Sequence, residues 1–221
     1  LTSVTLNAVW TGIDDGAFEN CKALSSINFG TAAKDATEQP QAVGERALLG
    51  TALTEINFAG TNVASLSSDL FVDYDKSYTE DVPNNATLTA VTFSKVIGAV
   101  PAGIFANCTA LKTVEFEERE VATESTPGNP KTFKVDFTGI GKYAFANTAI
   151  EEIVIPEALN AKLSLNVYAI AENAFFNCGK LKSFTYMIDN ETIGIVMVVN
   201  PLAFPGCSNV DRKSTRLNSS H

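Results

Sequence analysis

The chain has little of what many enzymes and membrane proteins need. Its 221 residues include a single histidine, His221, and no uninterrupted apolar run long enough to cross a bilayer. The longest apolar run, IGIVMVV at residues 193–199, has the length of a strand. Because Ser–His–Asp and Cys–His nucleophile systems need a histidine as base, the composition argues against both kinds of chemistry.

Basic residues are also scarce. The chain holds 16 Lys and Arg against 25 Asp and Glu, which gives a formal net charge of −9 at pH 7. Nucleic acids and anionic membranes are bound through a basic surface, so we expect neither as a partner and no membrane insertion. At 45% hydrophobic residues the chain is nevertheless apolar enough to bury a core.

What the chain does have is a recurring apolar frame. Each full unit contains an Ile-Gly-like lead, a turn with Ala-Phe and Asn-Cys, and a short segment of the form L-x-x-I-x-F. The large apolar residues of the frame are Phe18, Leu48, Phe71, Phe105, Phe145, Phe175 and Phe204, at intervals of 23 to 40 residues. A period of this length is typical of solenoids, in which neighbouring units bury one another's apolar face.

The L-x-x-I-x-F segments alternate between apolar and polar residues, which predicts half-buried strands. We expect the following side chains to point inward: Val4, Leu6, Ile27, Phe29, Ile56, Phe58, Val114 and Phe116. Since all units run in the same direction, their strands should pair in parallel, one per repeat. Further β-rich runs at residues 132–137, 163–170 and 193–199 predict a second sheet or hairpins. The expected fold is therefore a mainly β solenoid of about seven units, with short helical or 3₁₀ turns and with loop insertions.

The frame I-G-x-x-A-F-x-x-C-x-x-L-x-x-I-x-I resembles the BspA-like leucine-rich repeats of bacterial surface proteins. Residues 13–29 (IDDGAFENCKALSSINF) and 140–156 (IGKYAFANTAIEEIVIP) match it almost position for position. The resemblance extends over nearly all of residues 1–210. It implies a leucine-rich-repeat solenoid that is secreted or attached to the cell surface, with a role in adhesion to host proteins or other cells.

Both ends of the chain interrupt this pattern. The first residues, LTSVTL, already carry the repeat, and the repeat stops after Val210. We expect residues 1–210 to be a single solenoid fragment, truncated at both ends. Residues 211–221 (DRKSTRLNSSH) resemble one translated reading frame of a short-read sequencing adapter, so we expect a non-native tail that includes the histidine.

Cysteine occupies one position of the repeat. The four cysteines are Cys21, Cys108, Cys178 and Cys207, and Thr51 and Thr148 take the same position in other units. A column of buried small residues is the expected role, because free cysteine is among the most buried residue types. A disulfide between Cys178 and Cys207, on adjacent units, is the alternative. With no C-x₂-C pair and no histidine before residue 221, a zinc site is not expected.

The residue before that position is usually asparagine. The repeated asparagines are Asn20, Asn107, Asn147 and Asn177. Asparagine tolerates left-handed backbone geometry and bonds nearby backbone groups, so we predict a structural role.

The remaining polar residues offer little chemistry. Calcium at residues 14–16 (DDG) or 69–75 is conceivable, but an EF-hand pattern is lacking. No phosphate-cradling glycine loop is present, and the acidic runs read as solvated turns. We therefore predict no catalytic residue, metal or cofactor, and a protein that is not an enzyme.

Contacts with a ligand are expected at two places. One is the outward side of the strands, where the candidates are Glu55, Asn57, Thr92, Glu115 and Glu152. The other is the acidic insertion at residues 72–85, where Tyr74 and Tyr78 lie among Asp73 and Asp75. For both places the alternative is a merely solvated surface.

The predicted function is that of a monomeric, extracellular binding or adhesion module that engages protein or glycan. A structural spacer that holds another domain away from the cell is the alternative.

Overall fold

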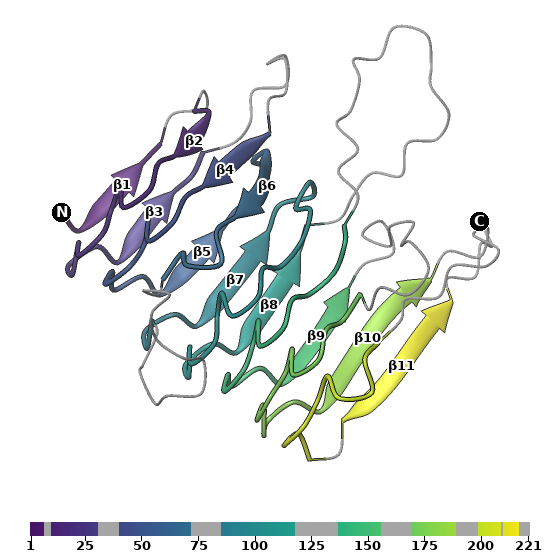
Figure 1. Ribbon diagram of the computed structural model, residues 1–221. Coiled ribbons are helices and arrows are strands. Elements are labelled where there is room, and N and C mark those ends of the chain that lie inside the picture. The colour runs from purple at the N-terminus through teal and green to yellow at the C-terminus, as the bar shows by residue number, and fades with distance from the viewer. Residues whose placement is uncertain are drawn as a thin grey trace, which may run out of the picture.

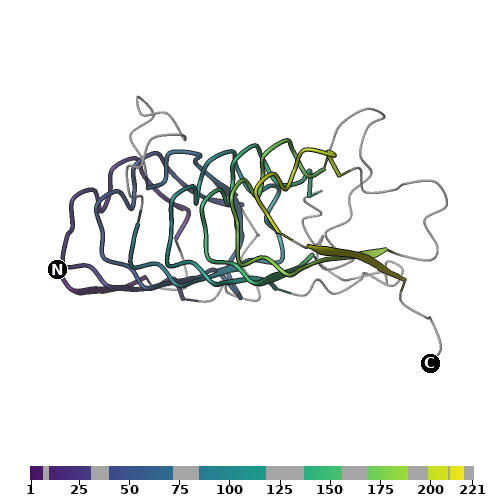
Figure 2. The same ribbon diagram turned by 90° about the horizontal axis from the view of Figure 1, so that it is seen from below.

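The computed structural model describes residues 1–6, 10–30, 40–71, 85–117, 137–155, 169–188, 199–208 and 210–216. These residues form an elongated solenoid in which each unit lies beside the next (Figure 1). Figure 2 shows the strands edge-on on one side of the solenoid, which we call the wall, and the turns on the opposite side. The leucine-rich-repeat solenoid predicted from the sequence is confirmed, while the expected number of about seven units stays a prediction.

The first wall consists of one short strand from each unit. Its strands are β1 (Ser3–Thr5), β3 (Ser26–Asn28), β5 (Glu55–Asn57), β7 (Ala90–Phe93), β8 (Thr113–Phe116), β9 (Glu152–Ile155), β10 (Ser183–Ile188) and β11 (Asp211–Arg216). All pairs are parallel, and they form three sheets, β1–β3, β5–β7–β8 and β9–β10–β11. Equivalent positions of neighbouring units pair, as the sequence predicts.

A second parallel ladder follows the lead of each unit. It contains β2 (Gly12–Ile13), β4 (Gln41–Val43) and β6 (Val63–Leu66). Single bridges extend it through Val100, Ile140, Ile170 and Val199. A second sheet therefore exists, as predicted. In the described part of the chain, however, its strands come mainly from the Ile-Gly-like lead of each unit and not from the β-rich runs. Most of the runs at 132–137, 163–170 and 193–199 lies outside the described residues; Ile170 and Val199 are the last residues of two of them.

The third side of each unit is a hydrogen-bonded turn. Within a unit, bonds span three residues, as from Cys21 N to Phe18 O at 3.1 Å. Between units, Phe145 N donates to Ala174 O at 2.9 Å. These segments were expected to be helical or 3₁₀, but the described residues contain turns and no helix. Left-handed residues interrupt each turn, as at Gly103 and Asn107, so the bonding does not continue into a helix.

The core is a column of aromatic rings. The rings of Phe145 and Phe175 lie 5.4 Å apart and nearly parallel, and Phe105 and Phe204 extend the stack at 5.7 and 5.2 Å. Leu48 fills the same position in an earlier unit and is fully buried. Six of the predicted inward residues are buried, namely Ile27, Phe29, Ile56, Phe58, Val114 and Phe116. Val4 and Leu6 are half-buried, since their unit has a neighbour on one side within the described residues.

Strand β11 comprises the first residues of the segment that resembles an adapter translation. It pairs with β10 along its whole length, from Ser183–Asp211 to Ile188–Arg216. A ladder of this kind joins backbone groups and does not depend on particular side chains. The pairing therefore neither supports nor contradicts the expectation that residues 211–221 are a non-native tail, which stays a prediction.

Candidate functional site

The outward side of the first wall carries the predicted contact residues. The five candidates Glu55, Asn57, Thr92, Glu115 and Glu152 all lie on strands whose inward neighbours are buried. Thr92 is half-buried and the other four are exposed. We call this surface the outward face. The alternation of each strand places these side chains there, because successive residues point to opposite sides.

Strand pairing brings three of the candidates into one row. Asn57 pairs with Thr92, and Thr92 pairs with Glu115, across β5, β7 and β8. Glu55 is paired with Ala90, one row away. Glu152 lies on β9, which belongs to the next sheet. The other candidates, Tyr74, Tyr78, Asp73 and Asp75, lie outside the described residues.

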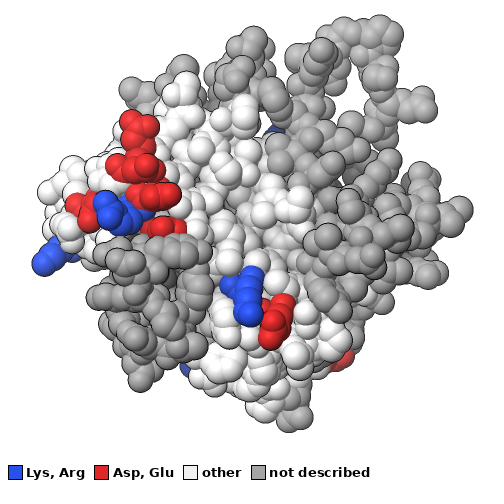
Figure 3. Space-filling view, in the orientation of Figure 1, with Lys and Arg blue, Asp and Glu red and all other residues white. Residues whose placement is uncertain are grey.

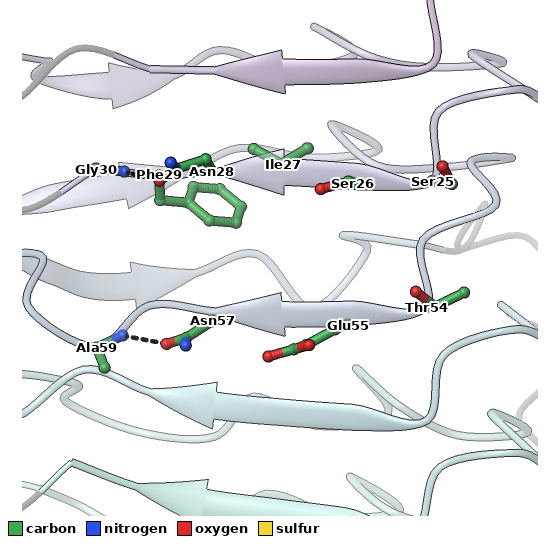
Figure 4. Close-up of a pocket in the computed structure, with 10 residues that line it drawn as sticks. All are labelled: Ser25, Ser26, Ile27, Asn28, Phe29, Gly30, Thr54, Glu55, Asn57 and Ala59. Atoms are coloured by element: carbon green, nitrogen blue, oxygen red, sulfur yellow. Dashed lines mark hydrogen bonds between the residues drawn. The ribbon is translucent and has the colours of Figure 1, made fainter.

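The outward face is hollowed between β3 and β5. These strands are consecutive in the wall, and both lie wholly within the described residues, yet no pairing joins them. A groove of about 630 Å³ opens at this break (Figure 4). We call it the β3–β5 groove. Its polar lining includes Ser26, Asn28, Thr54, Glu55 and Asn57.

The two asparagines of the groove are held in the same way. Asn28 Oδ1 accepts a bond from Gly30 N at 2.9 Å, and Asn57 Oδ1 accepts one from Ala59 N, also at 2.9 Å (Figure 4). Such Asx turns fix the side chain at the end of a strand. Each amide oxygen is therefore bound locally, while no described bond uses either amide nitrogen.

Sequence reasoning predicted only part of this groove. Glu55 and Asn57 were candidates, whereas Ser26, Asn28 and Thr54 were not. The groove arises because β3 and β5 do not pair. This depends on how the two units stack, and the alternation of apolar and polar residues in either strand does not reveal it.

The charged candidates of the outward face are all acidic. Glu55, Glu115 and Glu152 take part in none of the ion pairs of the described chain. Those ion pairs are Arg46–Glu19, Lys142–Glu172 and Lys182–Glu151, and their carboxylates lie elsewhere. Figure 3 shows basic and acidic groups side by side on the surface that it presents, with acidic groups gathered over the N-terminal units. The outward face, by contrast, keeps its carboxylates unneutralised.

The cysteine column is partly buried and entirely reduced. Cys108 and Cys178 are buried, Cys21 and Cys207 are half-buried, and all four are free. The Cys178 thiol donates to Phe145 O at 3.0 Å, so it bonds the backbone of the preceding unit. Burial raises the pKa of Cys108 to about 12. The buried-column prediction is thus confirmed for Cys108 and Cys178, and the alternative disulfide is not formed.

The described residues hold no group of three or more His, Cys, Asp or Glu that could bind a metal ion. Of the conceivable calcium ligands, Asp15 accepts a bond from Glu45 N at 2.7 Å through Oδ1. That carboxylate has a structural partner in the next unit. Nor does this part of the chain include a helix of the length and apolarity that a membrane span requires.

Comparison with known families identifies the architecture. The model of the BspA type leucine rich repeat region matches residues 1–87 and 84–211, with six copies. The chain belongs to the family of BspA type leucine-rich-repeat proteins.

Three solved structures are similar to this chain. A leucine rich cell surface protein from Faecalibacterium prausnitzii A2-165 is 16% identical with a TM-score of 0.34, over 99% of this chain and 60% of that one. A leucine-rich repeat protein from Bacteroides ovatus ATCC 8483 is 17% identical with a TM-score of 0.35, over 98% and 61%. A third, from Eubacterium ventriosum ATCC 27560, is 16% identical with a TM-score of 0.35, over 98% and 73%.

The chain spans about three fifths of the length of the first two of these proteins. No curated protein matches it.

Proposed function

We propose that this chain is a non-enzymatic binding module that engages a protein or glycan through its outward face. The β3–β5 groove carries this proposal, because it is a hollow lined by hydrogen-bonding groups at a break in the wall. Repeat proteins commonly use an extended face of the solenoid in this way. The row Asn57–Thr92–Glu115 continues the polar surface beyond the groove.

The proposed location is the outside of a bacterial cell. Membership of the family supports this, and one similar structure is described as a leucine rich cell surface protein. A surface module would meet its ligand in solution or on another cell, without a membrane-spanning segment of its own in the described part.

A structural spacer is the second candidate, and the turn side of the solenoid favours it. Backbone bonds join successive units there, as at Phe105 N–Ala144 O, Phe145 N–Ala174 O and Phe175 N–Ala203 O, each 2.9 Å long. Such continuity makes a stiff rod, which is what a spacer needs.

A binding screen separates the two. The whole chain is passed over an array of glycans and a panel of extracellular matrix proteins, with binding measured by biolayer interferometry. A binding module gives at least one saturable response without turnover of the ligand. A spacer gives none, which would overturn the proposal.

The same screen compares the two predicted contact regions. The double variant Tyr74→Ala/Tyr78→Ala removes the aromatic side chains of the acidic insertion. If the outward face is the binding surface, this variant binds within twofold of the parent chain. If binding is lost in this variant and not in variants of the outward face, the binding site lies in the acidic insertion at residues 72–85.

A further inference from the structure

The break in the wall between β3 and β5 has the features of a peptide site. We propose that the β3–β5 groove binds an extended peptide segment with basic side chains, running along the solenoid axis across the two strands. This inference rests on the proposed function and names the chemical class of its ligand.

The groove is a built opening between two units that are otherwise closed. On the turn side, Phe18 N donates to Ala47 O at 2.9 Å, and Asn20 N to Leu49 O at 2.7 Å. The second ladder is also intact, with Gly12 paired to Ala42. The two units therefore meet along two sides and separate only at the outward strands.

Separation leaves both strands with an edge that has no partner strand. β3 pairs with β1 on its other side, and β5 pairs with β7. An unpaired strand edge presents backbone N–H and C=O groups to the opening, where a peptide that crosses the strands can bond to single groups without adding a strand to the sheet. Beneath this opening the rings of Phe29 and Phe58 pack at 4.6 Å, so the floor is closed.

The asparagine amides supply directed donors. Asn28 and Asn57 occupy equivalent positions of neighbouring units, and their oxygens are bound to Gly30 N and Ala59 N. Their amide nitrogens are the groups left for a ligand, and a peptide carbonyl is a suitable acceptor. In an extended chain, carbonyls on the same side recur about every 6.6 Å, since each residue advances about 3.3 Å. A single segment that crosses β3 and β5 can therefore offer carbonyls to both amides.

Charge selects the side chains of the ligand. Glu55 is exposed and lies in the lining, whose described residues include no Lys or Arg. Glu115 and Glu152 add negative charge along the same face, and the whole chain carries −9. A Lys or Arg side chain of the peptide would pair with Glu55, and complementary potentials favour its approach.

A peptide fits this lining better than a sugar chain does. Among the described lining residues Phe29 is the one aromatic, and its exposed fraction is 2%. No exposed ring in the groove is thus available to stack on the apolar face of a sugar. The lining instead offers amide and hydroxyl groups beside one carboxylate, which match the backbone and the cation of a basic peptide.

The test uses an octapeptide of alternating Lys and Thr, labelled with tetramethylrhodamine at its N-terminus and amidated at its C-terminus. It is titrated with the whole chain and followed by fluorescence anisotropy. We expect saturable binding that weakens as sodium chloride rises, because salt screens exposed charges. The variant Glu55→Gln should weaken binding at least fivefold. Its matched control is Glu45→Gln, which removes the same charge at an exposed position on the turn side and should change binding less than twofold.

A second pair of variants tests the amides. The double variant Asn28→Ala/Asn57→Ala should weaken binding at least tenfold, while Thr109→Ala, at an exposed position after the turn that ends at Asn107, should leave it unchanged. Thermal unfolding of each variant shows whether the fold is kept. Since Glu55→Gln touches only an exposed side chain, it tests the groove even if the asparagine variant unfolds.

Three results would overturn the inference. These are no saturable binding of the octapeptide, equal weakening by Glu55→Gln and Glu45→Gln, or tighter binding of a neutral hexasaccharide of N-acetylglucosamine in the same groove. None of these results contradicts the proposed function if the binding screen finds another ligand of the outward face. The proposed function is contradicted only if that screen finds no ligand.

Discussion

The side-chain amide of Asn147 donates to Oδ1 of Asn107 at 2.6 Å, which links two neighbouring units. Asn177 in turn donates to Oδ1 of Asn147 at 2.8 Å. All three residues have left-handed backbone geometry, with φ of 62° at Asn107, 57° at Asn147 and 54° at Asn177. The structural role predicted for the repeated asparagines is confirmed here: they fit a backbone conformation that few residues adopt and they bond across units.

Substitution of Asn147 separates these two contributions. Asn147→Gly keeps the left-handed backbone and loses the side-chain bonds, so we expect a loss of about 1 kcal/mol in the free energy of unfolding. Asn147→Ala keeps a β-carbon in that conformation without the carboxamide that lets asparagine tolerate it, so it should lose about 1–2 kcal/mol more than the glycine variant. Urea unfolding followed by circular dichroism measures both. Two other units already have glycine at this position, Gly50 and Gly206, both with left-handed geometry. If Asn147→Gly were at least as destabilising as Asn147→Ala, the backbone geometry would not be decisive.

The glycine of the lead allows two units to approach closely. A β-carbon on Gly141 would lie 2.5 Å from Ala102 N and 2.8 Å from Ala102 Cα. We therefore expect Gly141→Ala to destabilise the chain by more than about 2 kcal/mol, since backbone must shift to admit it. Gly179→Ala is the control, because nothing lies within 4 Å of its added β-carbon. Equal unfolding midpoints of the two variants in urea would contradict this account of the lead.

The phenylalanine column should tolerate leucine better than alanine. Phe145 stacks on Phe105 and Phe175, and Leu48 occupies the same position elsewhere while fully buried. We expect Phe145→Ala to cost about 3–5 kcal/mol because it leaves a cavity between units. Phe145→Leu should cost less than about 1.5 kcal/mol. Thermal unfolding midpoints rank the two variants, and a reversed order would disprove the stacking argument.

The buried thiol of Cys108 should make the fold sensitive to alkali. Burial raises its pKa from 9.0 to about 12, so the folded chain keeps a proton that the unfolded chain releases. Stability from this group is complete below pH 9 and falls as pH rises toward 12, by about 1.4 kcal/mol per pH unit. Cys108→Thr removes the ionising group and copies the residue found at Thr51 and Thr148. Urea midpoints at pH 8 and 10.5 should fall further for the parent chain than for the variant; equal falls would exclude this thiol as the cause.

The strands and the core could be predicted from the sequence because each depends on local spacing. Alternation placed Ile56 and Phe58 inward and Glu55 and Asn57 outward, and the structure has them so. The aromatic column followed from the period of the frame.

The second ladder and the groove could not be predicted in the same way. The segments that form β2 and β4, Gly12–Ile13 and Gln41–Val43, share no common alternation of apolar and polar residues, unlike the L-x-x-I-x-F segments. The break between β3 and β5 arises from the stacking of two units, which is a long-range property. A sequence pattern describes one unit at a time, so it predicts which residues face outward but not where the wall opens.

The central claim is that the outward face is the binding surface, and a pair of matched arginine substitutions tests it most directly. Thr92→Arg places a long cation in the row between Asn57 and Glu115, whereas Thr109→Arg places the same side chain at an exposed site after the turn that ends at Asn107. Dissociation constants for the ligand that gives the strongest saturable response in the screen are measured with both variants. We expect Thr92→Arg to weaken binding at least tenfold and Thr109→Arg to change it less than twofold. Unchanged binding by Thr92→Arg, or a loss confined to Thr109→Arg, would contradict the account.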